Sequence, residues 1–228
     1  MSLKIKGWRK IIKWSVWGTL VVLFVVFFVR VVAFEANYYA EKDGSERAVA
    51  ETAQEPEEEL IEEEPTEEEV REYIVPADHP RYLTVSKLGI NNARILLMGV
   101  NSKGELDTPR NIFDVGWYEA SGKPGQGGTM IIDGHNGGPH VLGVFKNLPS
   151  LEEGDIITIE RGDGIIYKYS VVENNTVSLD ESDAYMAVAA KSPVVGKESV
   201  TLISCTGEWS QQQRTYLSRQ FVRAILVE

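Results

Sequence analysis

The chain has 228 residues and a formal net charge of −11, which is distributed unevenly. Residues 1–34 hold six Lys or Arg and no acid, residues 35–79 hold 17 acidic and three basic residues (net −14), and residues 80–228 hold 17 and 14 (net −3). The near-neutral last region argues against nucleic acid as a partner. A single cysteine excludes an intramolecular disulfide.

The first predicted element is an apolar segment at residues 14–34, which carries one charge, Arg30, near its end. Its 21 residues match the ~20 that cross a bilayer core. The basic residues within 1–13 predict a cytoplasmic N-terminus by the positive-inside rule. A cleaved signal peptide is the alternative, but no small-residue cleavage site follows closely. We therefore expect a single-pass anchor in the cell membrane, with all later residues extracellular.

Residues 35–79 form the second predicted region, an acidic linker. Runs of three glutamates recur here, broken by Pro56 and Pro65. Like charges repel and such a composition buries little apolar surface, so we expect an extended, disordered spacer. Short helices near 57–61 and 67–73 would be marginal on their own.

The remaining residues, 80–228, are predicted to fold as a mainly β domain. Short apolar runs are separated by turn residues such as Gly162-Asp163-Gly164, which favours a hairpin. The expected strands lie near 82–86, 93–97, 128–133, 155–161, 165–174, 199–204 and 220–227. Many short strands with few helices are typical of a closed or nearly closed β-barrel. Two short helices are expected, over 183–190 and 141–148.

Cys205 ends one of these strands, and a Gly-bearing turn follows it. Arg219 opens the next strand fourteen residues later. A thiol at a strand end, near a permanent cation, is a setting typical of a reactive cysteine. The alternative is a buried free cysteine that behaves as a small hydrophobic residue. Arg214 competes with Arg219 as the cation, but it lies in a polar loop.

A cysteine nucleophile needs a base or an imidazolium partner. Of the three histidines, His79 lies beside Pro80 and His140 lies in a Gly-rich loop. His135 instead follows an apolar strand at a Gly-flanked turn, the same arrangement as at Cys205, although a hydrogen-bonded turn histidine is the alternative. Asp133, close before it, would favour an imidazolium or point to solvent.

These motifs resemble those of the sortases, the membrane-anchored cysteine transpeptidases of bacterial surfaces. The similarity covers residues 82–228. Thr201-Leu202-Ile203-Ser204-Cys205 is similar to the family's TLxTC motif, with Ser204 in place of Thr, and Gly134-His135 is similar to the family's Gly-His turn. The run GWY…PG…GH…GP…VF…L…GD, over residues 116–155, is closest to class F.

The resemblance implies an eight-stranded sortase barrel and a two-step acyl transfer. Cys205 would attack the Thr carbonyl of an LPxTG-like sorting signal, His135 would protonate the leaving amine, and Arg219 would stabilise the oxyanion. Thr201 and Ser204 would contact substrate. The partners implied are surface proteins with a C-terminal sorting signal and an amine acceptor, either a cell-wall precursor or a pilin Lys.

Two other functions remain open from the sequence. A hydrolytic cysteine peptidase would use the same residues, because the acyl-enzyme is shared and only the acceptor differs. A non-catalytic, membrane-tethered β-barrel binding module would keep Cys205 merely buried. No cofactor or metal is predicted, since a solvated acidic loop explains Glu105, Asp107 and Asp114 as well as a cation site does.

Overall fold

The computed structural model of the protein describes residues 59–101, 104 and 106–228. The predicted anchor at 14–34 and the first part of the predicted linker lie outside these residues. Among the helices within the described ranges, none is both long enough and apolar enough to cross a bilayer.

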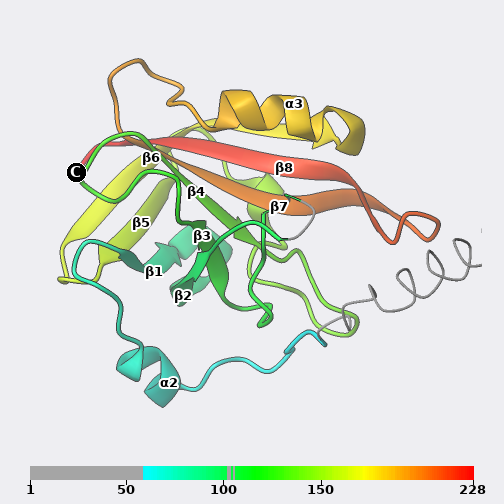
Figure 1. The fold of residues 1–228 in the computed structure, drawn as a ribbon, viewed down its shortest axis with the longest axis horizontal. Coiled ribbons are helices and arrows are strands. Elements are labelled where there is room, and N and C mark those ends of the chain that lie inside the picture. The colour runs from blue at the N-terminus through cyan, green and yellow to red at the C-terminus, as the bar shows by residue number, and fades with distance from the viewer. Residues whose placement is uncertain (1–58, 102–103, 105) are drawn as a thin grey trace, which may run out of the picture. The chain divides into compact units, whose positions relative to one another are not determined.

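Eight strands close into a barrel in the order β1-β2-β3-β4-β7-β8-β6-β5, as Figure 1 shows, and the predicted mainly β, eight-stranded architecture is confirmed. Their bounds are β1 Pro80–Val85, β2 Ile90–Met98, β3 Val115–Tyr118, β4 Thr129–Gly134, β5 Ile156–Arg161, β6 Ile166–Ser178, β7 Ser199–Ser210 and β8 Thr215–Leu226. The helices are α2 (Glu67–Glu72) and α3 (Leu179–Ala189), with 3₁₀ turns η1 (Ser86–Leu88) and η2 (Leu148–Ser150).

Strand alternation divides the sheet into two faces. Met130, Ile132 and Leu202 point into the barrel and belong to its main core. The residues between them, Ile131 and Ile203, point outward and form a second cluster with Phe221 and Ala189 of α3. This outer face of β4, β7 and β8 also carries the candidate site, because side chains two residues apart along a strand share a face.

α3 connects β6 to β7 and covers part of this outer face (Figure 1). Ser178 and Glu181 hydrogen-bond at its N-terminus, and two acidic residues lie in its first turn, which favours that helix end. At its C-terminal end, Arg223 of β8 donates to the carbonyls of Val188 and Lys191 at 3.2 and 2.7 Å. The helix is therefore fastened to the sheet.

The predicted hairpin around Gly162–Gly164 is confirmed, since β5 and β6 pair antiparallel on either side of it. The helix predicted over 141–148 is wrong. Its backbone groups bond to distant residues instead: Val144 N–H donates to Ile112 at 2.9 Å and Phe145 N–H donates to His135 at 2.9 Å. These long-range bonds use the donors that a helix would need for its own turns.

Residues 59–79 lie against the barrel, which differs from the spacer predicted for 35–79. α2 begins with a capping box, in which Thr66 N–H donates to Glu69 at 2.8 Å and Glu69 N–H donates to Thr66 at 3.2 Å. The hydroxyl of Tyr73 donates to the Ile95 carbonyl at 2.6 Å, and that of Tyr82 donates to Val70. We call residues 59–66, before this helix, the strap.

Candidate active site

Cys205 and Arg219 lie side by side on β7 and β8, and His135 directly follows β4, the strand that pairs with the other side of β7. We call these three residues the row. β4 and β7 pair in parallel up to Asp133 opposite Ile203, and beyond that pair the Ser204 hydroxyl donates to the Gly134 carbonyl at 2.9 Å. His135 is the first residue after β4. On the other side of β7, Cys205 pairs directly with Arg219 of β8. Cys205 and Arg219 share the outer face, and neighbouring strands lie only about 4.8 Å apart.

Cys205 is a free thiol that is partly buried. Burial raises the pKa of this thiol, the nearby Arg219 guanidinium lowers it, and the Asp133 carboxylate raises it again. The thiol is therefore the resting form at neutral pH, and a base must remove its proton before the sulfur can act as a nucleophile.

His135 is the residue of the row for which the sequence predicts the role of base. Its Nε2 lies 2.8 Å from the carbonyl oxygen of Pro109. A carbonyl only accepts, so Nε2 carries the hydrogen and Nδ1 is left as the acceptor in the neutral ring. Burial lowers the pKa of His135, an effect that the Pro109 hydrogen bond opposes. The imidazole is thus neutral at neutral pH and able to take a proton.

Arg219 is oriented by the hairpin beyond the row. Its Nη1 donates to the carbonyls of Tyr216 and Ser218 at 2.9 and 3.1 Å, and its Nη2 donates to Thr215 Oγ1 at 3.3 Å. Arg214 lies in the exposed tip of this hairpin, five residues from Arg219, or about 17 Å along an extended strand. Register therefore places Arg219, and not Arg214, beside Cys205.

The two predicted substrate-contacting residues lie on either side of the sheet. Ser204 is buried, and its hydroxyl ties β7 to Gly134, the residue before His135. Thr201 shares the outer face of Cys205 but lies beneath α3, where its hydroxyl donates to the Ala189 carbonyl at 2.8 Å. Both hydroxyls thus have partners within the protein, and their contact with substrate stays a prediction.

Asp133 is a charged neighbour of the row whose placement the sequence left open. Its carboxyl lies over Gly116 of β3, where a Cβ atom would come 2.5 Å from Oδ1, so only glycine leaves room for it. Burial raises the pKa of Asp133 to about 7, against a hydrogen bond from the Thr108 side chain that lowers it, with Asp107 adding a further rise. In the sequence, the triplet Asp133-Gly134-His135 was the feature that could have pointed to a carboxyl close to this site.

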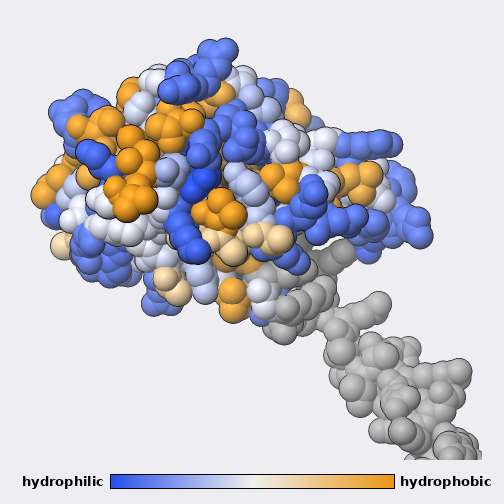
Figure 2. Space-filling model, turned by 90° about the horizontal axis from the view of Figure 1, so that it is seen from above, coloured by the Kyte–Doolittle hydropathy of each residue, from blue (hydrophilic) through white to orange (hydrophobic). Residues whose placement is uncertain are grey.

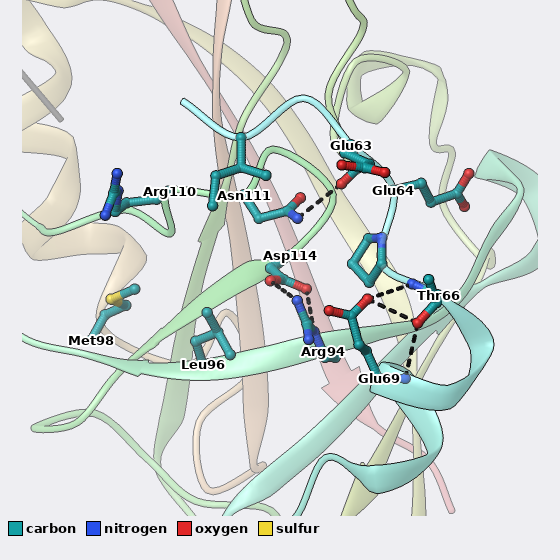
Figure 3. A pocket seen from close by; sticks show the side chains of 12 residues that line it. Glu63, Glu64, Thr66, Glu69, Arg94, Leu96, Met98, Arg110, Asn111 and Asp114 are labelled. Carbon is teal, nitrogen blue, oxygen red and sulfur yellow. Dashed lines mark hydrogen bonds and ion pairs between the residues drawn. The ribbon is translucent and has the colours of Figure 1, made fainter. Parts of the chain in front are cut away.

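A separate cavity of about 730 Å³ lies between the strap, β2 and residues 110–114 (Figure 3). Leu96 and Met98 contribute apolar lining, and Arg94 forms a two-pronged ion pair with the buried Asp114, at 2.9 and 2.7 Å. None of the three residues of the row lines this cavity.

Comparison with known proteins identifies the domain. The model of the sortase domain family matches residues 83–227. Among solved structures, a sortase D5 transpeptidase from Clostridium perfringens is 23% identical (TM-score 0.46), over 72% of this chain and 90% of that one. Sortase A from Corynebacterium diphtheriae is 24% identical, with a TM-score of 0.46, over 67% of this chain and 61% of that one. A pilus-related sortase C of group B Streptococcus is 22% identical, with a TM-score of 0.47, over 76% of this chain and 77% of that one. Curated proteins gave no match.

Proposed function

The chain belongs to the sortase family, and from this premise we propose that it is a membrane-anchored cysteine transpeptidase of the class F type. Its substrate is a protein with an LPxTG-like sorting signal, which it cleaves between Thr and Gly and transfers to an amine. Residues 14–34 are its anchor, and the catalytic domain lies outside the membrane. The observation that carries the proposal is the pairing of Cys205 with Arg219, with His135 directly after the neighbouring strand β4.

The chemistry follows from the protonation states of the row. His135 takes the thiol proton as the sulfur of Cys205 attacks the Thr carbonyl, and the Arg219 guanidinium stabilises the oxyanion that forms. The C–N bond to Gly then breaks, and His135 gives its proton to the departing amine. A thioester remains on Cys205.

The second half of the reaction returns the enzyme to its resting state. An acceptor amine attacks the thioester, the sulfur leaves, and His135 takes a proton from the incoming nitrogen and returns it to the sulfur. Both halves use one base and one cation, in agreement with a site that holds a single histidine and a single arginine in the row. A cell-wall precursor or a pilin Lys supplies the amine.

Intact mass spectrometry of the full chain with an LPxTG peptide tests the proposal. We expect an adduct equal to the peptide up to Thr, absent in Cys205→Ala and released by added amine as a new amide. If the bound peptide is released only as the free acid, even when amine is added, the protein is a hydrolase instead. If no peptide from a panel of sorting motifs forms an adduct, and Cys205 also resists alkylation, the result would favour a binding module.

A further inference from the structure

The strap is bonded to the segment that carries Pro109. Ile61 N–H donates to the Arg110 carbonyl at 2.9 Å, and Ile112 N–H donates to the Ile61 carbonyl at 3.1 Å. Asn111 Nδ2 donates to the carbonyl of Glu63 at 3.0 Å, as Figure 3 shows. The strap thus runs alongside residues 110–112, directly after the proline whose carbonyl accepts from His135.

Glu62 extends from this strap onto the loop that follows His135. Its Oε1 accepts from the backbone N–H groups of His140 and Val141 at 2.8 and 3.1 Å. The same oxygen lies so close to Gly138 that a Cβ atom there would collide with it. These backbone hydrogen bonds lower the pKa of Glu62, as does the charge of His140, so the carboxylate is ionised at neutral pH. Charge-assisted bonds of this kind are stronger than neutral ones.

The loop that Glu62 contacts connects back to His135 through its own ladder. Gly138 N–H donates to Val141 at 2.8 Å, Gly143 N–H donates to Asn136 at 2.9 Å, and Phe145 N–H donates to His135 at 2.9 Å. Glu62 therefore closes the tip of a loop whose base is the histidine itself. The strap contacts both elements that fix the position of His135, the loop and the Pro109 segment.

We infer that Glu62 is a positioning residue for His135: it holds the catalytic histidine in place through the 136–143 loop. The inference rests on the proposed function, because His135 acts as acid and base only in that reaction. Such a role is distinct from catalysis, since Glu62 contacts the loop rather than the reacting atoms.

Other contacts hold this part of the chain on the barrel independently of Glu62. Between the strap and β2 lies an open space, and the chain is anchored again beyond it, where Tyr73 donates to Ile95 and Arg81 Nε donates to the Tyr73 carbonyl at 2.8 Å. We therefore expect the barrel and the α2 anchorage to stay in place when the Glu62 carboxylate is removed.

The test compares Glu62→Ala, Glu62→Gln and the control Glu64→Ala in the full chain. Glu64 is an exposed glutamate of the same strap that lines the cavity. We expect Glu62→Ala to lower kcat about 10- to 100-fold with little change in KM, because a small displacement of a catalytic group costs this much. Glu62→Gln retains an acceptor oxygen and keeps more of the activity. The control matches the wild type.

Two further measurements separate positioning from general stability. Hydrogen exchange of residues 136–143 should accelerate in Glu62→Ala alone. The ring resonances of His135, which are easily assigned because the chain has three histidines, should also shift in that variant. Wild-type kcat in Glu62→Ala, or faster exchange with unchanged kcat and ring resonances, would overturn the inference. If the wild type itself forms no acyl-enzyme, the proposed function fails, while exchange and ring resonances still decide whether Glu62 positions His135.

Discussion

Two sets of polar side chains on the outer face of the same sheet have different surroundings. The row of His135, Cys205 and Arg219 lies beyond α3, whereas Thr201 and Arg223, four residues back along β7 and forward along β8, lie beneath it. Under the helix, the polar groups bond to helix carbonyls. In the row beyond, His135 bonds to the Pro109 carbonyl and Arg219 bonds to residues 215–218 at the start of its own strand, β8. Whether α3 covers a polar side chain on this face therefore decides whether that side chain is bonded to the helix or left free of it.

Arg219 and Arg223 give the largest expected contrast, because they occupy the same face of one strand. Arg219→Gln should lower kcat/KM about 10²- to 10³-fold, as loss of an oxyanion donor does, with an unchanged thermal midpoint. Arg223→Gln should instead lower the unfolding free energy by about 2–4 kcal/mol, because it breaks the ion pair of the buried Arg223 with the partly exposed Glu173. Peptide kinetics and urea unfolding of both variants measure this. Equal effects on activity would contradict the comparison.

Gly116→Ala tests the packing that holds Asp133 next to the row. The new Cβ would meet the carboxyl oxygen and Met98, and overpacking of this kind costs about 1–3 kcal/mol. Thermal unfolding measures the loss. The double variant with Asp133→Ala should recover part of it, since the carboxyl no longer occupies the space; no recovery would mean that Met98 or Pro109 is the obstacle.

Asp133→Asn tests how the buried carboxyl beside the row makes the stability of the protein depend on pH. The folded pKa of about 7 lies above the unfolded value of ~3.9. The folded state therefore binds more protons between these values, and the stability from this group is lost as pH rises through 7. Asp133→Asn should then be more stable than the wild type at pH 8, by about 1–4 kcal/mol, and equal to it near pH 4. Melting curves across this range measure the difference.

The same variant should change the reactivity of the thiol. The Asp133 carboxylate raises the pKa of Cys205, so its removal should shift the alkylation profile of Cys205 to lower pH. Arg219→Gln should shift that profile the opposite way, because the guanidinium lowers this pKa. Rates of iodoacetamide labelling against pH measure both. Shifts in the same direction would mean that burial alone controls the thiol.

Thr201→Val is expected to have the smallest effect. It leaves the Ala189 carbonyl without its donor beneath α3, which costs about 1–2 kcal/mol, while Cys205 keeps its alkylation rate. Chemical denaturation measures the loss. A fall in kcat/KM without a fall in stability would instead place Thr201 in contact with substrate.

The sequence predicted the barrel better than it predicted the surroundings of the site. Alternating apolar runs located seven strands, but β3 was missed because it is four residues long, mostly buried and contains Gly116. Local pattern singled out Cys205, His135 and Arg219, but it placed two of them wrongly within their strands. Cys205 was predicted to end a strand and Arg219 to open one, whereas β7 and β8 extend several residues past them to form the long hairpin; only His135 directly follows its strand, β4. Pro109, Glu62 and the burial of Asp133 were not recognised, because each depends on contacts between segments far apart in the chain, which no local period encodes.

The hairpin of β7 and β8 extends past the row to an exposed tip at 211–214. Figure 2 shows mainly hydrophilic residues at that end of the molecule and hydrophobic residues gathered toward the opposite end. Trp209 and Tyr216 contact each other edge to face across the hairpin, with ring centroids 5.2 Å apart. The contact stiffens the segment from which Arg219 takes its hydrogen-bond partners.

The place of β8 in the barrel has a consequence for how the protein is made. It is the last strand in the described chain, yet it lies between β7 and β6 and pairs with both. The barrel therefore closes only after residues 215–226 have been synthesised, and pairings between such distant segments form slowly. Arg219 joins Cys205 at the same moment. A newly made chain thus acquires its reactive site together with its finished fold, and not before.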